Sequence, residues 1–331
     1  MNYKKISLIF LSISIILFFS STVMADENLT DLGNTIIVDG SSVNQMNEPT
    51  IQTAINNASA GDTIEITGTN YEHCHFIVDK QLKIVSNVGT KMSTCPSNIR
   101  GSDGVGIFYF NENASGSILS GFTLSNDAAK RGTVDPYAIY INGASNIEIT
   151  NCKVTEVTDG PGIYVVNGSD ININHDSIKK SNKGIYITDS NDINIAHSII
   201  NQNNEAGIYF GPNVENSSIV GNEIYYNNWK GIYYGSCVNS NVTSNNISDN
   251  RDNKVQSRAT QGTGIYVNSS MEYLKIIGNN INQNGNYGIF NSYLTKSSID
   301  EIKSYNDIEK IQEIDENIFI HHLTRCIYTQ Q

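Results

Sequence analysis

The chain has 331 residues, a formal net charge of −12 and 39% hydrophobic residues. This acidic balance disfavours nucleic acid or an anionic membrane surface as a general partner. The chain uses Asn, Gly, Ile and Tyr where helical arrays use Ala, Leu, Glu and Lys, which argues against a helical repeat.

Residues 1–25 have the pattern of a secretory signal peptide. Lys4 and Lys5 precede an apolar run, 6–19, and a small residue, Ala25, stands at the expected cleavage site. The run is shorter than the roughly 20 residues of a comfortable membrane span. We therefore expect a secreted or cell-surface protein with no membrane span after signal removal. An uncleaved anchor is the alternative.

The next two segments are predicted to begin the fold. Residues 26–47 form a leader and a first strand, and 48–105 form a capping helix and the first coils. Pro49 stands near a helix start, and the apolar residues that follow lie on one helical face. These apolar residues are Ile51, Ala54, Ile55 and Ala58. An amphipathic helix here suits a cover over the first coil, whose open strand edges would otherwise template aggregation.

Residues 106–297 carry a repeat that begins with Gly-Ile-aromatic. The triplets start at Gly106, Ala138, Gly162, Gly184, Gly207, Gly231, Gly264 and Gly288, where Ala138 replaces glycine. Successive starts differ by 22 to 24 residues, except for two longer intervals of 32 and 33. This is the period of a solenoid with two insertions.

Each repeat contains a second pattern that predicts three short strands. Two apolar residues stand five positions apart, as in Ile195 and Ile200, with polar turns around them. Three positions after the second apolar residue comes a polar side chain that we expect to stack into a ladder. These residues are Asn203, Asn227, Asn250 and Asn284, with Asp127 and Ser181 in equivalent places. The sequence therefore predicts an all-β fold, a parallel β-helix, with strands paired coil upon coil.

Residues 298–331 change to a charged, Ile-rich composition and are predicted to form a C-terminal cap or tail. Eight Asn-x-Ser/Thr triplets fit an exported glycoprotein. Five cysteines leave one unpaired even in an oxidising compartment, and Cys74 with Cys95 is the first disulfide candidate because the two lie close in sequence.

A family resemblance rests on the N-terminal run and on the coils together. The run contains Thr50-Ile51-Gln52-Thr53-Ala54-Ile55, Ala60-Gly61-Asp62-Thr63-Ile64 and Leu82-Lys83-Ile84. With the coils it resembles the right-handed parallel β-helix repeat proteins of the pectate-lyase-like superfold, and more narrowly the adhesin-like surface proteins of methanogenic archaea. The resemblance covers roughly 34–295 and implies a fold, not a reaction.

The third position of each triplet is predicted to face outward, because strand alternation buries the Ile before it. This gives an aromatic stripe of Phe108, Tyr140, Tyr164, Tyr186, Tyr209, Tyr233, Tyr266 and Phe290. Such a stripe can stack on sugar rings and bond their hydroxyls. Alternatively, the rings stack on one another and only stiffen the sheet.

Two insertions, 128–137 and 251–263, precede Gly-Ile-aromatic strands and should leave the same corner of the coil. They carry the cations Lys130, Arg131, Arg251, Lys254 and Arg258. Together with the stripe they predict a groove for a polysaccharide or cell-surface glycan, of which an anionic glycan is the first to test. Two solvated loops with ordinary charges are the alternative.

The carboxylates available for catalysis near the stripe are Asp135, Asp159 and Glu205. Glycoside hydrolysis needs two such groups at a set separation, and lyase chemistry needs a base with cations. The chain lacks the Asn-Thr-Asp, Asp-Asp, Gly-His-Gly and Arg-Ile-Lys set of polygalacturonases. We therefore predict a non-catalytic, adhesin-like glycan-binding protein. The alternatives are a polysaccharide lyase, hydrolase or epimerase and a purely structural wall component.

No metal or cofactor is predicted. His175 and His197 stand at the same place in adjacent coils, but two imidazoles without a third ligand make a poor site, and stacked turn histidines explain them. Asp170 and Asp192 also stack and either share a calcium ion or face water. If the run His73-Cys74-His75 is a strand, alternation sends the cysteine to the opposite side from both histidines.

Overall fold

The structure is a computed structural model that describes residues 33–39, 50–94, 106–126, 136–251, 262–268, 273–291 and 307–308. The described residues all belong to one compact unit, Gly33–Gln331. The predicted signal peptide, 1–25, lies outside the described residues, as do most of the predicted leader and of the C-terminal segment 298–331.

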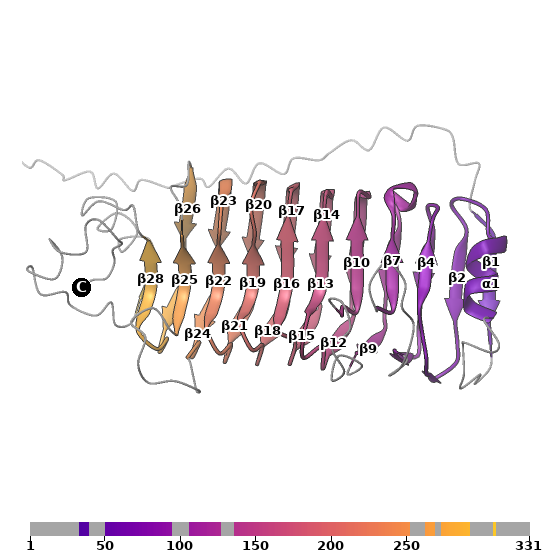
Figure 1. The fold of residues 1–331 in the computed structure, drawn as a ribbon, viewed down its shortest axis with the longest axis horizontal. Coiled ribbons are helices and arrows are strands. Elements are labelled where there is room, and N and C mark those ends of the chain that lie inside the picture. Colours follow the sequence, from indigo (N-terminus) through magenta and orange to yellow (C-terminus); the bar gives the residue numbers. More distant parts are fainter. Residues whose placement is uncertain are drawn as a thin grey trace, which may run out of the picture. The chain divides into compact units, whose positions relative to one another are not determined.

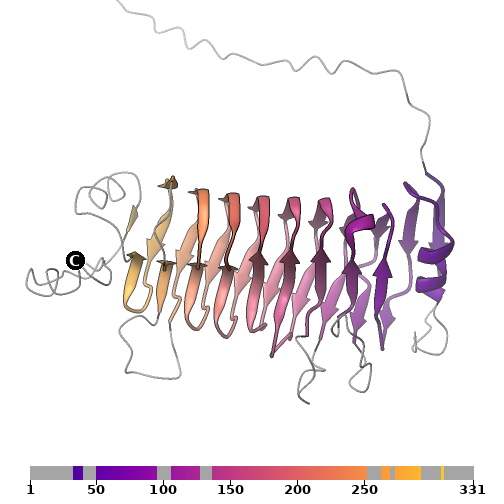
Figure 2. The same cartoon turned by 45° about the horizontal axis from the view of Figure 1, so that its top comes forward.

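The described strands form three parallel sheets, in which each strand pairs with its equivalents in the preceding and following coils (Figure 1). The same stacking is seen from a second direction in Figure 2. The first sheet contains β1 (Thr35–Val38), β2 (Thr63–Ile66), β5 (Lys83–Val85), β8 (Ile118–Ser120), β11 (Ser145–Thr150), β14 (Ser169–Asn174), β17 (Ser190–Ala196), β20 (Val214–Val220), β23 (Cys237–Thr243) and β26 (Leu274–Ile277). The second contains β3 (Asn70–Tyr71), β6 (Lys91–Ser93), β9 (Thr123–Ser125), β12 (Lys153–Thr155), β15 (Ser177–Lys179), β18 (Ile199–Asn201), β21 (Glu223–Tyr225), β24 (Asn246–Ser248), β27 (Asn280–Asn282) and β29 (Asp307–Ile308). The third contains β4 (Phe76–Val78), β7 (Phe108–Phe110), β10 (Ile139–Asn142), β13 (Pro161–Val166), β16 (Lys183–Thr188), β19 (Ala206–Phe210), β22 (Lys230–Tyr234), β25 (Thr263–Val267) and β28 (Tyr287–Asn291).

The core is a set of apolar columns that run from coil to coil. In the third sheet, Ile139 pairs with Ile163, which pairs with Ile185, and all three are fully buried. The apolar pairs five residues apart bracket the turn between the first and second sheets, and both members, such as Ile195 and Ile200, face inward. The predicted parallel β-helix with three strands per coil is therefore confirmed.

Two ladders of buried polar side chains line the turns. The predicted ladder follows the second sheet, where Asn203 Nδ2 donates to Asn227 Oδ1 at 2.9 Å and Asn227 Nδ2 donates to Asn250 Oδ1 at 3.0 Å. Ser181 and Asn284 extend it, whereas Asp127 lies outside the described residues. Sequence reasoning missed a second ladder, after the first sheet, although its asparagines also stand three positions after an apolar residue. Its members are Cys152, Asp176, Ser198, Asn222, Asn245 and Asn279.

Left-handed backbone conformations place these ladder residues inside the turns. The residue before each ladder side chain has positive φ, for example Gln202 at 56° before Asn203 and His197 at 50° before Ser198. This conformation reverses the chain direction so that the next side chain points inward, and Asn, Asp and His tolerate it better than most residues. The turns therefore depend on local backbone geometry as well as on the ladders.

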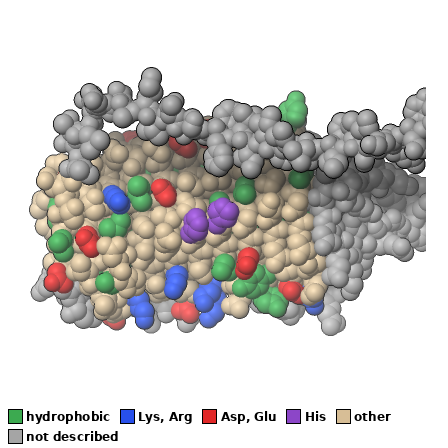
Figure 3. All heavy atoms as spheres, turned by 180° about the vertical axis from the view of Figure 1, so that it is seen from behind, with side chains coloured by type: hydrophobic (Ala, Val, Ile, Leu, Met, Phe, Trp, Pro, Cys, Tyr) green, Lys and Arg blue, Asp and Glu red, His purple; other side chains and the backbone are tan. Residues whose placement is uncertain are grey.

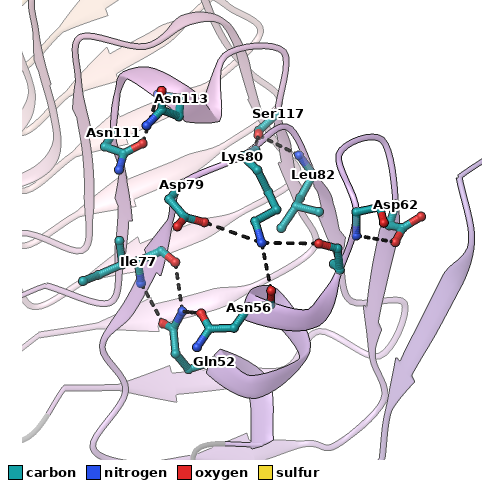
Figure 4. A network of polar contacts seen from close by, with 12 residues as sticks. Gln52, Asn56, Asp62, Ile77, Asp79, Lys80, Leu82, Asn111, Asn113 and Ser117 are labelled. Atoms are coloured by element: carbon teal, nitrogen blue, oxygen red, sulfur yellow. Dashed lines mark hydrogen bonds and ion pairs between the residues drawn. The ribbon is translucent and has the colours of Figure 1, made fainter.

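Helix α1 (Thr50–Asn57) lies against β1, β2 and β4, with Ile51 and Ile55 buried. Figure 4 shows how its side chains meet the edge of β4. The Gln52 amide accepts from Ile77 N at 2.8 Å and donates to Ile77 O at 3.0 Å, as a neighbouring strand would. Lys80 Nζ donates to Asn56 O at 2.9 Å and to Ala58 O at 3.3 Å, satisfying carbonyl groups at the C-terminal end of the helix.

The predicted register of the first triplet is wrong. Phe108 pairs with Ile139 and is fully buried, and Tyr109 pairs with Tyr140 and faces outward. Phe108 instead packs in the core with ring centroids 5.4 Å from Phe76 and 5.6 Å from Phe122. The run Phe108-Tyr109-Phe110 alternates equally well in either register, and burial of two phenylalanines rather than one tyrosine decides between them.

The remaining described elements are short. The 3₁₀ helix η1 (Glu112–Ala114) follows β7, and β29 pairs with β27, so the second sheet continues into the segment predicted as a cap or tail. Within the described ranges, no helix has the length and apolar character needed to cross a membrane.

Candidate functional site: the tyrosine column

The outward position of the third sheet carries one aromatic ring per coil along eight coils. We call this set the tyrosine column. It consists of Tyr109, Tyr140, Tyr164, Tyr186, Tyr209, Tyr233, Tyr266 and Phe290. The seven tyrosines are partly exposed, as the sequence predicted for six of them. Phe290 stacks on Tyr266 at 4.7 Å but is 6% exposed, so the expectation that it faces solvent is wrong.

The rings stack on one another because parallel pairing repeats every side chain at one strand spacing. Neighbouring centroids lie 4.3 to 5.4 Å apart, and the interplanar angles are 8° to 20° at six of the seven steps. The remaining step, from Tyr186 to Tyr209, has an angle of 89° at a centroid distance of 5.2 Å. The column is thus two stacks whose planes are perpendicular to one another.

Lys183 and Glu205 lie at the step where the two stacks meet. Lys183 Nζ is 2.6 Å from Glu205 Oε2, and it lies 5.4 Å from the Tyr186 ring centroid and 4.9 Å from that of Tyr209. The Lys183 and Glu205 side chains are 18% and 24% exposed. Cation–π attraction and the ion pair both hold the ammonium group against the rings.

Burial raises the pKa of Tyr209, and its hydrogen bond with the Tyr233 hydroxyl raises it further. Burial likewise raises the pKa of Tyr233, with a smaller contribution from the negative charge of Glu205. Both phenols therefore stay protonated at neutral pH and act as hydrogen-bond donors and acceptors, not as bases.

Lys230 occupies the place of Lys183 two coils further on, one residue before the triplet glycine. It is 2% exposed, and its Nζ lies 4.3 Å from the Tyr266 ring centroid and 5.1 Å from that of Trp229. Sequence reasoning missed both lysines. The signal that identifies them is their shared position before Gly184 and Gly231.

The flanks of both insertions support the predicted shared corner. The insertion 128–137 connects β9 of the second sheet to β10 of the third, and 251–263 connects β24 of the second to β25 of the third. Arg251 is described, and its guanidinium group donates to Asp249 Oδ1 at 3.1 Å and to Gln283 O at 3.1 Å. The other predicted cations, Lys130, Arg131, Lys254 and Arg258, lie outside the described residues.

The candidate acids are not brought together as a catalytic pair in the part of the chain that the structure describes. Asp159 is exposed, and it precedes β13, two coils before Glu205. Glu205 binds Lys183 and accepts from Asn182 Nδ2 at 3.4 Å. Asp135 lies outside the described residues.

The described residues contain no group of three or more His, Cys, Asp or Glu side chains arranged to hold a metal ion. The rings of His175 and His197 lie next to one another in the exposed turn before the second ladder, with centroids 5.3 Å apart and planes tilted by 34° rather than stacked. Figure 3 shows side-by-side histidines on a face where charged and hydrophobic side chains are scattered among backbone and other side chains. Asp192 accepts from Asn216 Nδ2 at 3.1 Å and from Asn191 Nδ2 at 3.0 Å.

The described cysteines are buried thiols. Cys74 is buried, whereas its sequence neighbours His73 and His75 are partly exposed. Burial raises the pKa of Cys74 to about 12. Burial also raises the pKa of Cys152 to about 12 and that of Cys237 to about 11. Cys95 lies outside the described residues, so its pairing with Cys74 stays a prediction.

The profile of the family described as "Right handed beta helix region" matches residues 137–303, half of the chain. The chain belongs to this right-handed β-helix family. The matched region contains every coil of the tyrosine column after Tyr109. No curated protein sequence matches the chain significantly.

Several solved structures share the right-handed β-helix fold with this chain. Polygalacturonase from Erwinia carotovora ssp. carotovora is 14% identical, with a TM-score of 0.55 over 75% of this chain and 76% of the enzyme. Alginate lyase from Paenibacillus sp. str. FPU-7 is 11% identical, with a TM-score of 0.51 over 74% of this chain and 94% of that chain. The enzymatically active domain of tailspike protein 2 from bacteriophage CBA120 is 12% identical, with a TM-score of 0.51 over 75% of this chain and 42% of that chain. Because these identities are low, they establish the fold alone.

Proposed function

We propose that this protein is a secreted, adhesin-like surface protein that binds carbohydrate through the tyrosine column without catalysing a reaction. The observation that carries the proposal is the partly exposed row of tyrosines that repeats at one strand spacing along the third sheet. A glycan chain has its own regular repeat of apolar ring faces and hydroxyl groups, which aromatic rings and phenol hydroxyls complement.

Two other considerations support a glycan ligand. The acidic chain disfavours polyanions such as nucleic acid. Two proteins with the same fold are named polygalacturonase and alginate lyase, so the fold is compatible with a polysaccharide ligand. The enzyme alternative lacks a comparable observation, since Glu205 is engaged by Lys183 at 2.6 Å. The similarity to archaeal adhesin-like proteins, the secretion and the glycosylation belong to this proposal as expectations.

A glycan array probed with the protein lacking residues 1–25 tests the proposal. Tyr164→Ala with Tyr233→Ala removes one ring from each stack, and binding should weaken at least about tenfold. Tyr225→Ala is the matched control, because this partly exposed tyrosine lies on the second sheet. Absence of any glycan binding, or binding that survives the double substitution, contradicts the proposal. Strong self-association without a ligand would indicate the structural alternative.

A further inference from the structure

The step from Tyr186 to Tyr209 differs from every other step of the tyrosine column. Tyr186 is nearly parallel to Tyr164, at 9°, and Tyr209 is nearly parallel to Tyr233, at 20°. At 89°, the edge of one junction ring meets the face of the other. An edge covers less of a ring face than a parallel ring does. Lys183 Nζ lies over both rings, at 5.4 Å from the Tyr186 centroid and 4.9 Å from the Tyr209 centroid, and both tyrosines still have partly exposed surface. Such surface can pack against the apolar face of a sugar ring.

The polar groups at this junction come as a pair of opposite charges. Lys183 Nζ lies 2.6 Å from Glu205 Oε2, and both side chains are partly exposed, at 18% and 24%. A carboxylate accepts several hydrogen bonds and an ammonium group has three donors, so each retains capacity beyond the ion pair. The pair therefore offers an acceptor and a donor side by side, next to an aromatic surface.

The charge balance disfavours an anionic sugar at this place. Lys183 is already neutralised by Glu205, whose Oε2 also accepts from Asn182 Nδ2. The carboxylate of a uronate would have to share the ammonium group and lie beside Glu205, where partial burial leaves like charges poorly screened. Sugar hydroxyls carry no such penalty and form charge-assisted hydrogen bonds with both groups.

The junction is also separated from the two strands that the insertions precede, β10 and β25. Tyr186 lies on β16, two strands from β10, and Tyr209 lies on β19, two strands from β25. Each separation is about 10 Å at the usual strand spacing. Arg251, the described cation of the second insertion, is engaged by Asp249 and Gln283.

We infer that the junction of Tyr186 and Tyr209 is a subsite for an uncharged sugar unit of a neutral glycan. Glu205 accepts from one hydroxyl of that sugar, Lys183 donates to an adjacent one, and the partly exposed surface of Tyr186 and Tyr209 packs against the sugar ring. This inference rests on the proposed function and specifies the class of ligand that the column takes.

Isothermal titration with two sets of oligosaccharides tests the inference. One set contains neutral glucose, mannose and galactose oligomers, and the other contains galacturonate and mannuronate oligomers. We expect the best neutral oligomer to bind at least about tenfold more tightly than any uronate. We also expect Glu205→Gln and Lys183→Met each to weaken neutral binding about tenfold, since each removes a charge-assisted hydrogen bond.

The matched control is an exposed ion pair of the same residue types. Lys180 Nζ lies 3.7 Å from Glu156 Oε1, with both side chains about half exposed at 51% and 52%. Lys180→Met and Glu156→Gln should leave neutral binding unchanged. Thermal melting of all four variants shows whether each is folded.

The outcomes separate the inference from the proposed function. Binding of uronates alone, or uronate binding that strengthens when Glu205→Gln frees Lys183, overturns the neutral subsite and leaves carbohydrate binding intact. Neutral binding that is unchanged in folded Glu205→Gln and Lys183→Met overturns the subsite but not its ligand class. Failure of both sets to bind overturns the proposed function together with the inference.

Discussion

The N-terminal coils and the central coils build the same fold by different means. In the N-terminal coils, Phe76, Phe108, Phe110 and Phe122 fill the core with contacting or neighbouring aromatic rings. In the central coils, 136–251, the core columns are mostly Ile and Val, and asparagine ladders close the turns. A parallel β-helix therefore tolerates an irregular core where large side chains fill it, and the outward tyrosine recurs in successive coils from Tyr109 to Tyr266.

The two regions also use different side chains to form the hydrogen bonds of their turns. In the N-terminal coils, hydroxyl groups bond locally or across one coil, as in Ser86 Oγ to Thr90 Oγ1 at 2.7 Å and Thr94 Oγ1 to Asn126 Oδ1 at 2.7 Å. In the central coils, four ladder asparagines bond both a neighbouring asparagine and a backbone carbonyl, as Asn227 does with Asn250 and Ile200. An amide has two donor hydrogens and an acceptor oxygen, so one asparagine can bond the next coil and a backbone carbonyl at once, whereas a hydroxyl has a single donor hydrogen.

The largest expected effect lies in the aromatic core of the N-terminal coils. Phe108→Ala should lower the free energy of unfolding by about 3 to 5 kcal/mol, because it empties a fully buried ring site. Tyr109→Ala, the adjacent outward residue, should cost only about 1 kcal/mol for its lost ring contact. Denaturant unfolding of both variants checks the register. A larger loss for Tyr109→Ala would restore the register predicted from the sequence.

Removing an asparagine from the ladder of the central coils should lower the free energy of unfolding almost as much. Asn227→Ala leaves the amide donor and backbone N–H of Asn203 and the carbonyl of Ile200 without their side-chain partner. The expected loss is about 3 kcal/mol or more, since each buried group left unsatisfied costs about 1 to 3 kcal/mol. Chemical unfolding beside the exposed control Asn204→Ala measures it. Equal stabilities of the two variants would show that the ladder contributes nothing.

Asp176, a member of the second ladder, should make the stability of the protein depend on pH. Its Oδ1 accepts from Cys152 N at 2.7 Å, its buried Oδ2 has no hydrogen-bond partner, and burial raises its pKa well above the ordinary value. Above the pKa of the unfolded chain, the folded state holds a proton that the unfolded state has lost. Stability should therefore fall as pH rises, by about 1.4 kcal/mol per pH unit, until the folded pKa is reached.

Asp176→Asn should remove this fall, because an amide does not titrate and can donate to a carbonyl as Asn222 Nδ2 does to Ile195 O. The variant should be more stable than the parent at pH 7, and the difference should shrink as the pH falls from the folded pKa of Asp176 to about 4, below which it should stay constant. Thermal melting from pH 3 to pH 8 measures it, with the exposed Asp170→Asn as control. A pH-independent difference would mean that Asp176 is ionised in the fold.

The smallest effect is expected at the edge of β4. Gln52→Ala removes both hydrogen bonds to Ile77 at a partly exposed site, so the expected loss is about 1 kcal/mol. Thr53→Ala changes an exposed position of the same helix and should not destabilise the protein. Hydrogen exchange at the Ile77 amide provides a local readout. Unchanged protection in Gln52→Ala would show that α1 does not cover this edge through Gln52.

Much of the fold was predictable because a β-helix repeats short-range rules. The triplet spacing located the strands of the third sheet from β10 to β28, and the apolar pairs located the turns between the other two sheets. The first triplet failed because Phe108, Tyr109 and Phe110 satisfy alternation in two registers. The choice depends on Phe76 in the preceding coil and on Phe122 in the turn before β9. The second ladder was missed although Asn222, Asn245 and Asn279 have the same spacing as the first.

By itself, the sequence determined the period, the strands, the inward Ile columns and the outward position of six tyrosines, because period and alternation are local properties of the chain. Only the tertiary structure decided how those tyrosines stack and between which two rings the planes change by 89°. It also decided that Glu205 pairs with Lys183 at that step. Ring orientation and ion pairing depend on side chains from adjacent coils. Their geometry exists only once the coils are stacked in register.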